Sequence, residues 1–147
     1  MPKNETLLLA LAIALSVGTA RADTALYIFH GINSDSAPAA GVELVCLGSG
    51  KKIRKCHASR TRGGAVTKSA VVPTEKATAL ISRFYKKAQK SPSEVKAPAG
   101  CSGPLSFTLE WAETRRTETI CGDSKREQSL TGALFQAEHA IAGILNP

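Results

Sequence analysis

The 147-residue sequence has few aromatic residues and few acidic ones. Aromatics make up 5% of the chain, with one Trp, and the 12 Asp and Glu are outnumbered by 19 Lys and Arg. After the first 22 positions, no apolar run approaches the roughly 20 residues that a membrane-spanning helix needs. The composition is otherwise ordinary, which excludes collagen-like, coiled-coil and wholly disordered chains. The length fits one domain.

The first 22 residues have the pattern of a secretory signal peptide. Lys3 precedes an uncharged apolar run at 7–17, and Ala20 and Ala22 then form an A-x-A cleavage site. We expect cleavage after Ala22, a single mature domain of residues 23–147, and a secreted or periplasmic location. The alternative is a membrane anchor that stays attached. The mature chain is expected to lack a transmembrane segment.

All four cysteines lie in the expected mature chain. An even number in an exported chain predicts two disulfides, for which three pairings exist. We favour Cys46–Cys56 and Cys101–Cys121, because each pair flanks a turn-like stretch. The spacings match no zinc-ligand pattern and contain no C-x-x-C motif, so we predict no metal, cofactor or thioredoxin-like redox site.

Short β-rich segments predict antiparallel strands joined in hairpins. They lie at 25–30, 42–47, 53–58, 106–112 and 116–121, with a further short strand suggested at 65–72. The second and third strands should form a hairpin that brings Cys46 near Cys56. Residues 59–64 read as a flexible basic loop between the third strand and the segment at 65–72.

Two segments have helical periodicity. Residues 74–90 place apolar side chains on one arc and cations on the adjacent arc. Ser124 and Glu127 form a capping box before a second run that should reach Leu145. Glu138 is the one formal charge between Gln128 and Pro147, so this helix is expected to be covered on more than one side, within the fold or at a protein interface.

The order of these elements predicts the fold class. Hairpins imply antiparallel pairing, and helices on one face of such a sheet make a two-layer domain. We therefore expect a small α+β domain in which an antiparallel sheet built from hairpins carries two helices, with two disulfides.

Positive charge is concentrated between positions 51 and 90, where 12 basic residues accompany one acidic residue. The flanking segments of the mature chain are both net negative. Such a surface attracts an anionic polymer, an anionic lipid or an acidic protein surface. The candidate binding residues are ten of these basic side chains: Lys51, Lys52, Arg54, Lys55, Arg60, Arg62, Arg83, Lys86, Lys87 and Lys90. The alternative is a solvated surface that only keeps the protein soluble.

Other partners are less compatible with the sequence. Binding to single-stranded nucleic acid uses exposed aromatic side chains for stacking, and here aromatics are scarce and fall on apolar faces. Export also argues against a genomic target, so sequence-specific nucleic-acid binding is not predicted. The basic helix at 74–90 has no Trp on its apolar side, which weakens a membrane-surface interpretation.

No catalytic constellation is evident, and no catalytic residue is predicted. His30 ends the first expected strand and is followed by Ser34 and Asp35, but the G-x-S-x-G elbow is missing. His57 and His139 share no triad or ligand spacing with it. We therefore predict an exported, non-catalytic binding protein that uses the basic surface at 51–90 against an anionic envelope component or an acidic protein. The alternatives are an inhibitor of a protease or other hydrolase with a disulfide-tethered loop, and an adaptor subunit of a cell-envelope assembly.

One set of features bears on the inhibitor alternative. Ala25-Leu26 leads to His30-Gly31 and Val42-x-Leu44-x-Cys46, and Cys101 precedes an alternating strand that runs from Pro104 and returns to Cys121. These features cover about half of the expected mature chain and resemble the secreted subtilisin-inhibitor family. The resemblance implies two sequential disulfides and inhibition of serine proteases by an exposed loop beside a cysteine. The chain departs from that family in a shorter Cys101–Cys121 interval, an unmatched C-terminal helix and no specificity side chain at 99–103, and it is not assigned to it.

Overall fold

The computed structural model describes residues 22–30, 40–49, 52–91, 104–121 and 128–147. In chain order these residues form β1 (Ala22–His30), β2 (Gly41–Ser49), β3 (Lys52–Arg62), β4 (Ala65–Val72), α2 (Thr74–Gln89), β5 (Pro104–Trp111), β6 (Thr114–Cys121) and α3 (Gln128–Leu145).

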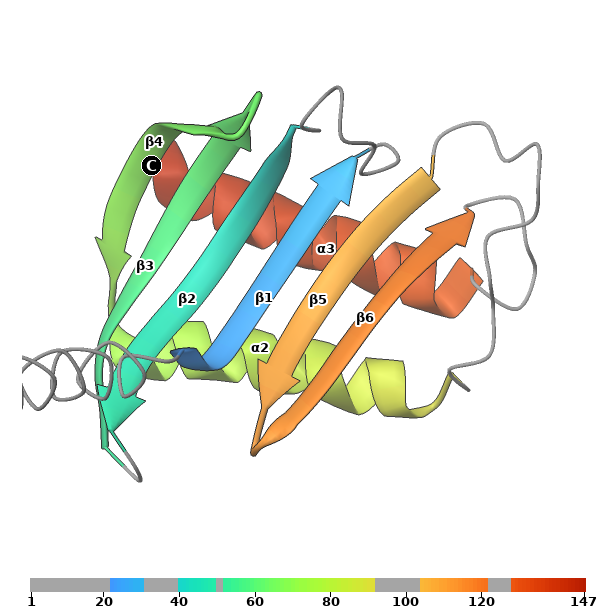
Figure 1. The fold of residues 1–147 in the computed structure, drawn as a ribbon, viewed down its shortest axis with the longest axis horizontal. Coiled ribbons are helices and arrows are strands. Elements are labelled where there is room, and N and C mark those ends of the chain that lie inside the picture. The colour runs from blue at the N-terminus through green and yellow to red at the C-terminus, as the bar shows by residue number, and fades with distance from the viewer. Residues whose placement is uncertain (1–21, 31–39, 50–51, 92–103, 122–127) are drawn as a thin grey trace, which may run out of the picture.

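The strands of the described residues form one sheet in the order β4-β3-β2-β1-β5-β6 (Figure 1). Every neighbouring pair is antiparallel. The chain first builds β1 to β4 as successive neighbours, passes through α2, and then adds β5 on the free side of β1. The strand β1 is therefore central, and β4 and β6 are the two edges.

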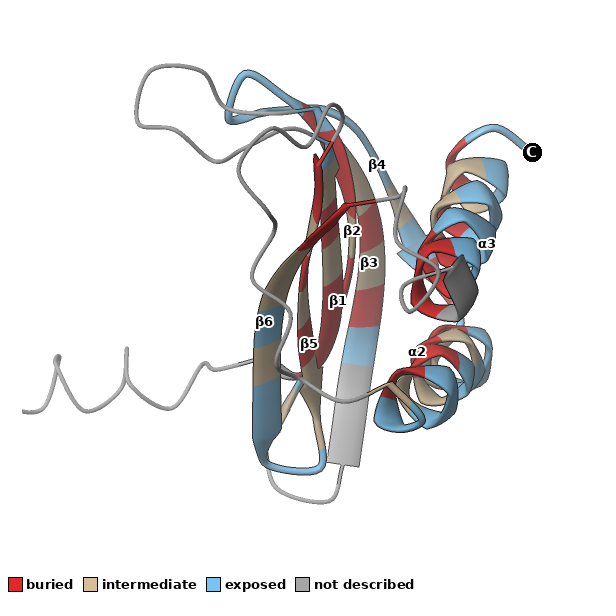
Figure 2. Cartoon of the chain, turned by 90° about the vertical axis from the view of Figure 1, so that its right-hand side faces the viewer, coloured by how far each residue is buried: buried red, intermediate tan, exposed pale blue. Residues whose placement is uncertain are grey.

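Both helices lie against the same face of the sheet, and the buried residues concentrate between the two layers (Figure 2). Side chains alternate along each strand, so Leu26 and Ile28 of β1 point to that face together with Val42 and Leu44 of β2. The helices contribute the facing half of the core, which includes Ala77, Ile81, Phe84, Ala88, Leu130, Leu134, Ile141 and Leu145. This arrangement confirms the predicted two-layer α+β fold.

The described helix α3 buries one side and exposes the other. Phe135 is 50% exposed, and Gly132, His139 and Gly143 on the same outward side are also exposed. Within this chain α3 is thus covered by the sheet on one side and by α2 on its flank, as expected, and only its outward side is uncovered. Neither described helix combines the length and apolar character that crossing a membrane requires.

The segment at 59–64 is a correction to the sequence-based prediction of a flexible loop. The strand β3 continues to Arg62, and Thr61 and Arg62 pair with residues of β4. Only Gly63 and Gly64 form the turn, with φ values of 62° and 76°. Two residues with positive φ close a two-residue hairpin loop, which glycine adopts without steric cost, so the basic residues before them stay extended.

The cysteines of β2 and β3 confirm one of the two predicted disulfides. Cys46 and Cys56 are directly opposite each other in the strand register, bonded, and fully buried, with Cα atoms 4.0 Å apart. Among the described residues the structure thus shows one of the two disulfides of the predicted fold class. Cys101 lies outside the described residues, so the Cys101–Cys121 pairing stays a prediction.

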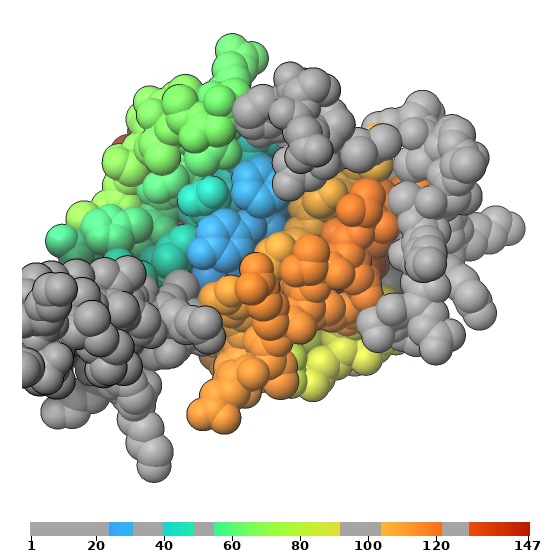
Figure 3. Space-filling view, viewed as in Figure 1, coloured from blue at the N-terminus to red at the C-terminus, as the bar shows by residue number. Residues whose placement is uncertain are grey.

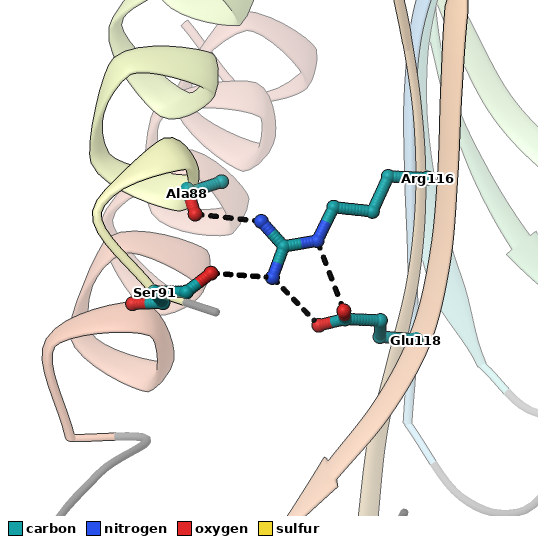
Figure 4. A network of polar contacts seen from close by, with 4 residues as sticks. All are labelled: Ala88, Ser91, Arg116 and Glu118. Carbon is teal, nitrogen blue, oxygen red and sulfur yellow. Dashed lines mark hydrogen bonds and ion pairs between the residues drawn. The ribbon is translucent and has the colours of Figure 1, made fainter. Parts of the chain in front are cut away.

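Arg116 of β6 joins the C-terminal end of α2 to the sheet (Figure 4). Its guanidinium donates hydrogen bonds to the carbonyl oxygens of Ala88 at 2.6 Å and Ser91 at 2.9 Å, and it contacts the carboxylate of Glu118 through two bonds of 3.0 Å. The guanidinium carbon also lies 5.8 Å from the ring centre of Phe107. The last carbonyls of a helix lack intrahelical donors and carry partial negative charge, so a cation there holds the helix end in place.

Candidate functional site

One end of the sheet carries polar side chains beyond the apolar core, on the face that the helices cover. Val42 of β2 is directly opposite Ile28 of β1 and Arg60 of β3, so these three side chains share one face. Two positions further along their strands, His30 and Arg62 follow on that same face. In Figure 1 this end of the sheet lies at the top, where the C-terminal half of α3 passes behind β3 and β2.

A cavity of about 370 Å³ opens between these strand ends and α3. The charged and titratable residues that line it are Arg60, Arg62, His30 and Glu138. Thr61 and Thr67 add hydroxyl groups, and Val42 and Ala142 supply apolar surface. The volume is in the range of pockets that take small molecules. Two of the predicted binding residues, Arg60 and Arg62, thus meet in one concave site.

The two arginines of this cavity have no carboxylate partner among the described residues. Arg60 is half-buried and Arg62 is exposed. Neither forms an ion pair with Glu138, although that carboxylate lines the same cavity. A guanidinium is always charged and presents a planar fork of N–H donors that matches a carboxylate or phosphate. The cavity can therefore supply two cationic forks to an anionic group.

A bulge shapes the arginine wall. The register between β3 and β4 shifts between Arg60 and Thr61, so that Thr67 of β4 is an extra residue at this level. The hydroxyl of Thr67 donates a hydrogen bond of 3.3 Å to the carbonyl oxygen of Arg60, and Thr61 donates one of 3.5 Å to the carbonyl oxygen of Gly41. These bonds fix the backbone that carries the two guanidinium groups.

The opposite wall is a pair that joins the first strand to the last helix. Nε2 of His30 lies 2.5 Å from Oε2 of Glu138, and the imidazole also stands 6.4 Å from the ring of Phe135. Both members of the pair are partly exposed. Oε1 of Glu138 has no hydrogen-bond partner among the described residues. The carboxylate therefore has acceptor capacity left on the cavity side.

A further cation lies next to the cavity on the edge strand. Lys68 of β4 is directly opposite Arg60, and its Nζ donates a hydrogen bond of 2.5 Å to Oδ1 of Asn146, just after α3. The partner is a neutral amide, so Lys68 keeps its full charge near the two arginines. Among the described side chains at this cavity, the three cations Arg60, Arg62 and Lys68 thus outnumber the carboxylate of Glu138.

The remaining predicted cations lie elsewhere. Arg83 and Lys87 of α2 line a second hollow of about 50 Å³ between the two helices, where Lys87 donates a bond of 2.7 Å to the amide oxygen of Gln136. Lys86 and Lys90 are exposed near the C-terminal end of α2. Lys55 is exposed toward the other end of β3 from Arg62. The position of Lys51 and the side chains of Lys52 and Arg54 lie outside the described residues.

The other chemistry-bearing residues of the sequence do not join the cavity. His57 sits between Val45 and Val71 in the strand register, on the sheet face away from the helices. His139 is exposed on α3. Ser34 and Asp35 lie outside the described residues. Among the described residues, no group of three or more His, Cys, Asp or Glu side chains is arranged to hold a metal ion.

The sheet face that the helices leave open has a different character (Figure 3). Paired hydroxyls cross β5 and β6, with 3.1 Å between Thr108 and Thr117. Near the centre of this face, Tyr27 and Glu43 are directly opposite each other. Burial raises the pKa of Glu43, and burial followed by the nearby carboxylates of Glu110 and Glu43 raises the pKa of Tyr27. The carboxylates of Glu43 and Glu110 therefore distinguish this face from the arginine-lined cavity.

Reasoning from the sequence predicted Arg60 and Arg62 but missed the other polar members of the cavity, which are His30, Thr61, Thr67 and Glu138. The isolated charge of Glu138 in an otherwise neutral helix was the available signal, because a single charge in an apolar segment needs a polar neighbour. Its partner His30 is 108 positions away, and nothing in the local pattern connects them.

No protein-family model matches the chain, and no curated protein matches it.

Proposed function

We propose that this protein is an exported, non-catalytic binding protein that recognises an anionic ligand through its basic surface at 51–90. The observation that carries the proposal is the cavity where Arg60 and Arg62 converge without a carboxylate partner among the described residues. A charged group that is half-buried and unpaired is costly in a folded protein. An anionic ligand would offset that cost, whereas a surface that served only solubility would leave its cations in water.

The cations outside the cavity have a supporting role in this proposal. Arg83, Lys86 and Lys90 on the exposed side of α2 do not line the cavity, but they raise the positive potential around the molecule. Such a field increases the rate of encounter with an anionic envelope polymer or an acidic surface. The cavity then provides the short-range contacts, so the two groups of cations should affect binding differently.

Polymer binding tests the proposal. Immobilised polygalacturonate, polyphosphate and poly-L-glutamate, together with anionic lipid vesicles, would be titrated with the oxidised protein. We expect at least one to bind, and R60Q/R62Q to weaken that binding by about tenfold or more, since two charge-assisted contacts are lost. The matched control R83Q/K86Q removes the same charge from α2 and should weaken binding by about threefold or less at 0.15 M salt, where distant charges are screened.

Equal losses in the two double variants would contradict the cavity as the binding site and leave only diffuse attraction. Binding of none of the four probes would contradict the proposal as a whole. Retained circular dichroism and an unchanged unfolding midpoint would establish that each variant is folded. Neither substitution pair touches the core, so we expect both variants to fold.

A second candidate function follows from the exposed side of α3. Phe135 is a large apolar side chain that is half exposed, and Gly132 and Gln136 beside it are exposed and uncharged. We propose this side as the contact of an adaptor if the protein belongs to an envelope assembly. F135Q would weaken such a contact without entering the core and without adding charge beside His30, whose ring lies 6.4 Å from that of Phe135. It should leave most polymer binding at Arg60 and Arg62 intact, and loss of that binding in F135Q would instead show that the two surfaces act together.

A further inference from the structure

The cavity beside α3 has both cationic and anionic residues in its lining, and this restricts the class of ligand that it can bind. Arg60 and Arg62 form a cationic wall, and the carboxylate of Glu138 lies on another wall of the same cavity. We infer that the cavity binds one sugar-acid unit of an acidic glycan, with the ligand's carboxylate on the arginines and its hydroxyl groups on Glu138. This inference rests on the proposed anion binding and specifies its ligand class.

The arginine wall selects the acidic end of the ligand. Two guanidinium groups on alternate positions of one strand, both on the cavity side, can each donate two parallel hydrogen bonds to a planar carboxylate. Lys68 lies opposite Arg60, but its ammonium donates a hydrogen bond to Asn146. It therefore adds to the positive potential of the cavity and does not contact the ligand. The short-range recognition of the anion therefore belongs to Arg60 and Arg62.

The carboxylate of Glu138 argues against a ligand that carries only negative charge. Its Oε2 accepts from His30, and its Oε1 has no donor among the described residues. A small anion would be repelled by this group, and a carboxylate such as acetate offers it no hydrogen-bond donor. A hydroxyl group donates to a carboxylate, and the oxygen lone pairs of Thr67 can accept from a neighbouring hydroxyl. A polyhydroxylated ring satisfies both.

The size and the apolar surface of the cavity favour a sugar over an acidic protein segment. Val42 and Ala142 offer apolar contact of the kind that the C–H face of a pyranose ring requires. The volume of about 370 Å³ suits a compact ligand, whereas a protein partner would seek a broad and flatter interface. The side chain of a Glu or Asp would reach the arginines and leave Glu138 without a donor.

The test compares small ligands on the oxidised full protein by NMR titration or calorimetry. The probes are D-glucuronate, D-glucose as the same ring without the carboxylate, acetate as the carboxylate without the ring, and inorganic phosphate. We expect D-glucuronate to bind at least about tenfold more tightly than each of the other three. R60Q/R62Q should abolish this binding, and K76Q/R115Q, which removes two exposed cations outside the cavity, should leave it within about twofold.

A conservative variant tests the role of Glu138. E138Q keeps an oxygen that can accept from His30 but removes the charge, so we expect the preference for D-glucuronate over acetate to fall from about tenfold to about threefold or less. An unchanged preference would overturn the assignment of the hydroxyl groups to Glu138. The unfolding midpoint of E138Q should stay close to that of the wild type, which separates this effect from loss of structure.

The outcomes distinguish this inference from the proposed function. If phosphate or acetate binds as tightly as D-glucuronate, the sugar-acid inference is wrong and the proposed anion binding stands. If no small ligand binds but polymer binding still depends on Arg60 and Arg62, the inference is likewise wrong and the proposed function stands. If neither small ligands nor polymers bind, both are wrong.

Discussion

Nε2 of His30 and Oε2 of Glu138 lie 2.5 Å apart, although 108 positions separate the two residues in the chain. This contact joins the end of β1 to α3 at the end of the sheet where the cavity opens. His30 ends the central strand, so the pair links the middle of the sheet to α3. The helix α3 passes over this end of the sheet, and Arg60 and Arg62 of β3 lie beyond the apolar core. The cavity lies between them.

Gly41 is required where β2 begins beside the cavity. A Cβ at this position would lie 2.5 Å from the carbonyl oxygen of Ile28 and 2.5 Å from Cδ1 of Phe29. We predict that G41A lowers the free energy of unfolding by about 2 kcal/mol, because backbone cannot move aside as a side chain does. G132A on the exposed side of α3 meets nothing within 4 Å and should raise it by about 0.5–1 kcal/mol. Denaturant midpoints that move in the same direction would contradict this pair of predictions.

The β5–β6 turn uses residues that are poorly suited to its backbone. Ala112 and Glu113 have φ values of 48° and 66°, which Asn and Gly adopt more readily. We predict that replacing them together by Asn-Gly raises the free energy of unfolding by about 1 kcal/mol. The converse change is G63A in the β3–β4 turn, where φ is 62° and a Cβ would meet nothing within 4 Å. We expect backbone strain alone to lower the free energy of unfolding in this variant. Thermal unfolding of both variants provides the measurement.

Glu43 makes stability depend on pH. Burial raises the pKa of its carboxyl in the folded state, so the folded protein holds this proton more tightly than the unfolded chain does. The favourable contribution is present below the unfolded pKa and is lost as the pH rises through the folded pKa. We predict that E43Q and the wild type are similarly stable at low pH and that E43Q is the more stable at pH 7. Urea unfolding at a series of pH values would show a constant difference if this account is wrong.

Arg116 should matter far more than its neighbour Arg115. R116L would remove the donor of the Ser91 carbonyl and the Glu118 carboxylate and one of the donors of the Ala88 carbonyl, at a cost of about 2 kcal/mol for this partly buried group. Arg115 contacts Glu110 at 3.6 Å and is largely exposed, so R115L should change stability by less than about 0.5 kcal/mol. Hydrogen exchange should show early opening at the end of α2 in R116L alone. Similar destabilisation by both variants would count against the described role.

Sequence periodicity predicted the local elements because each is determined by short-range patterns. The strand at 65–72 and the amphipathic helix from Thr74 were found at or near their observed positions, and so was the hairpin that pairs Cys46 with Cys56. The sequence predicts a longer loop around Gly63 and Gly64, because the basic residues before them are typical of exposed loops. Extended pairing with β4 overrides that composition.

The candidate site could not be predicted in the same way, since it depends on register and on helix placement. Lys55 and Arg62 belong to one basic run, yet they lie seven positions apart on β3, about 23 Å, and on opposite faces. Basic residues that are close together in the sequence are therefore not all close together in the fold. Arg60 and Arg62 came together with Glu138 only through the position of α3 over the strand ends.

The most direct test of anion binding at the cavity is a two-dimensional NMR map of the oxidised protein titrated with D-glucuronate. We predict that the largest shifts occur at the side-chain Nε–H groups of Arg60 and Arg62 and at the amides of Thr61 and Thr67, with little change along α2. Shifts that spread evenly over Arg83, Lys86 and the other surface cations would contradict the account. They would show a protein whose basic residues attract anions without a site.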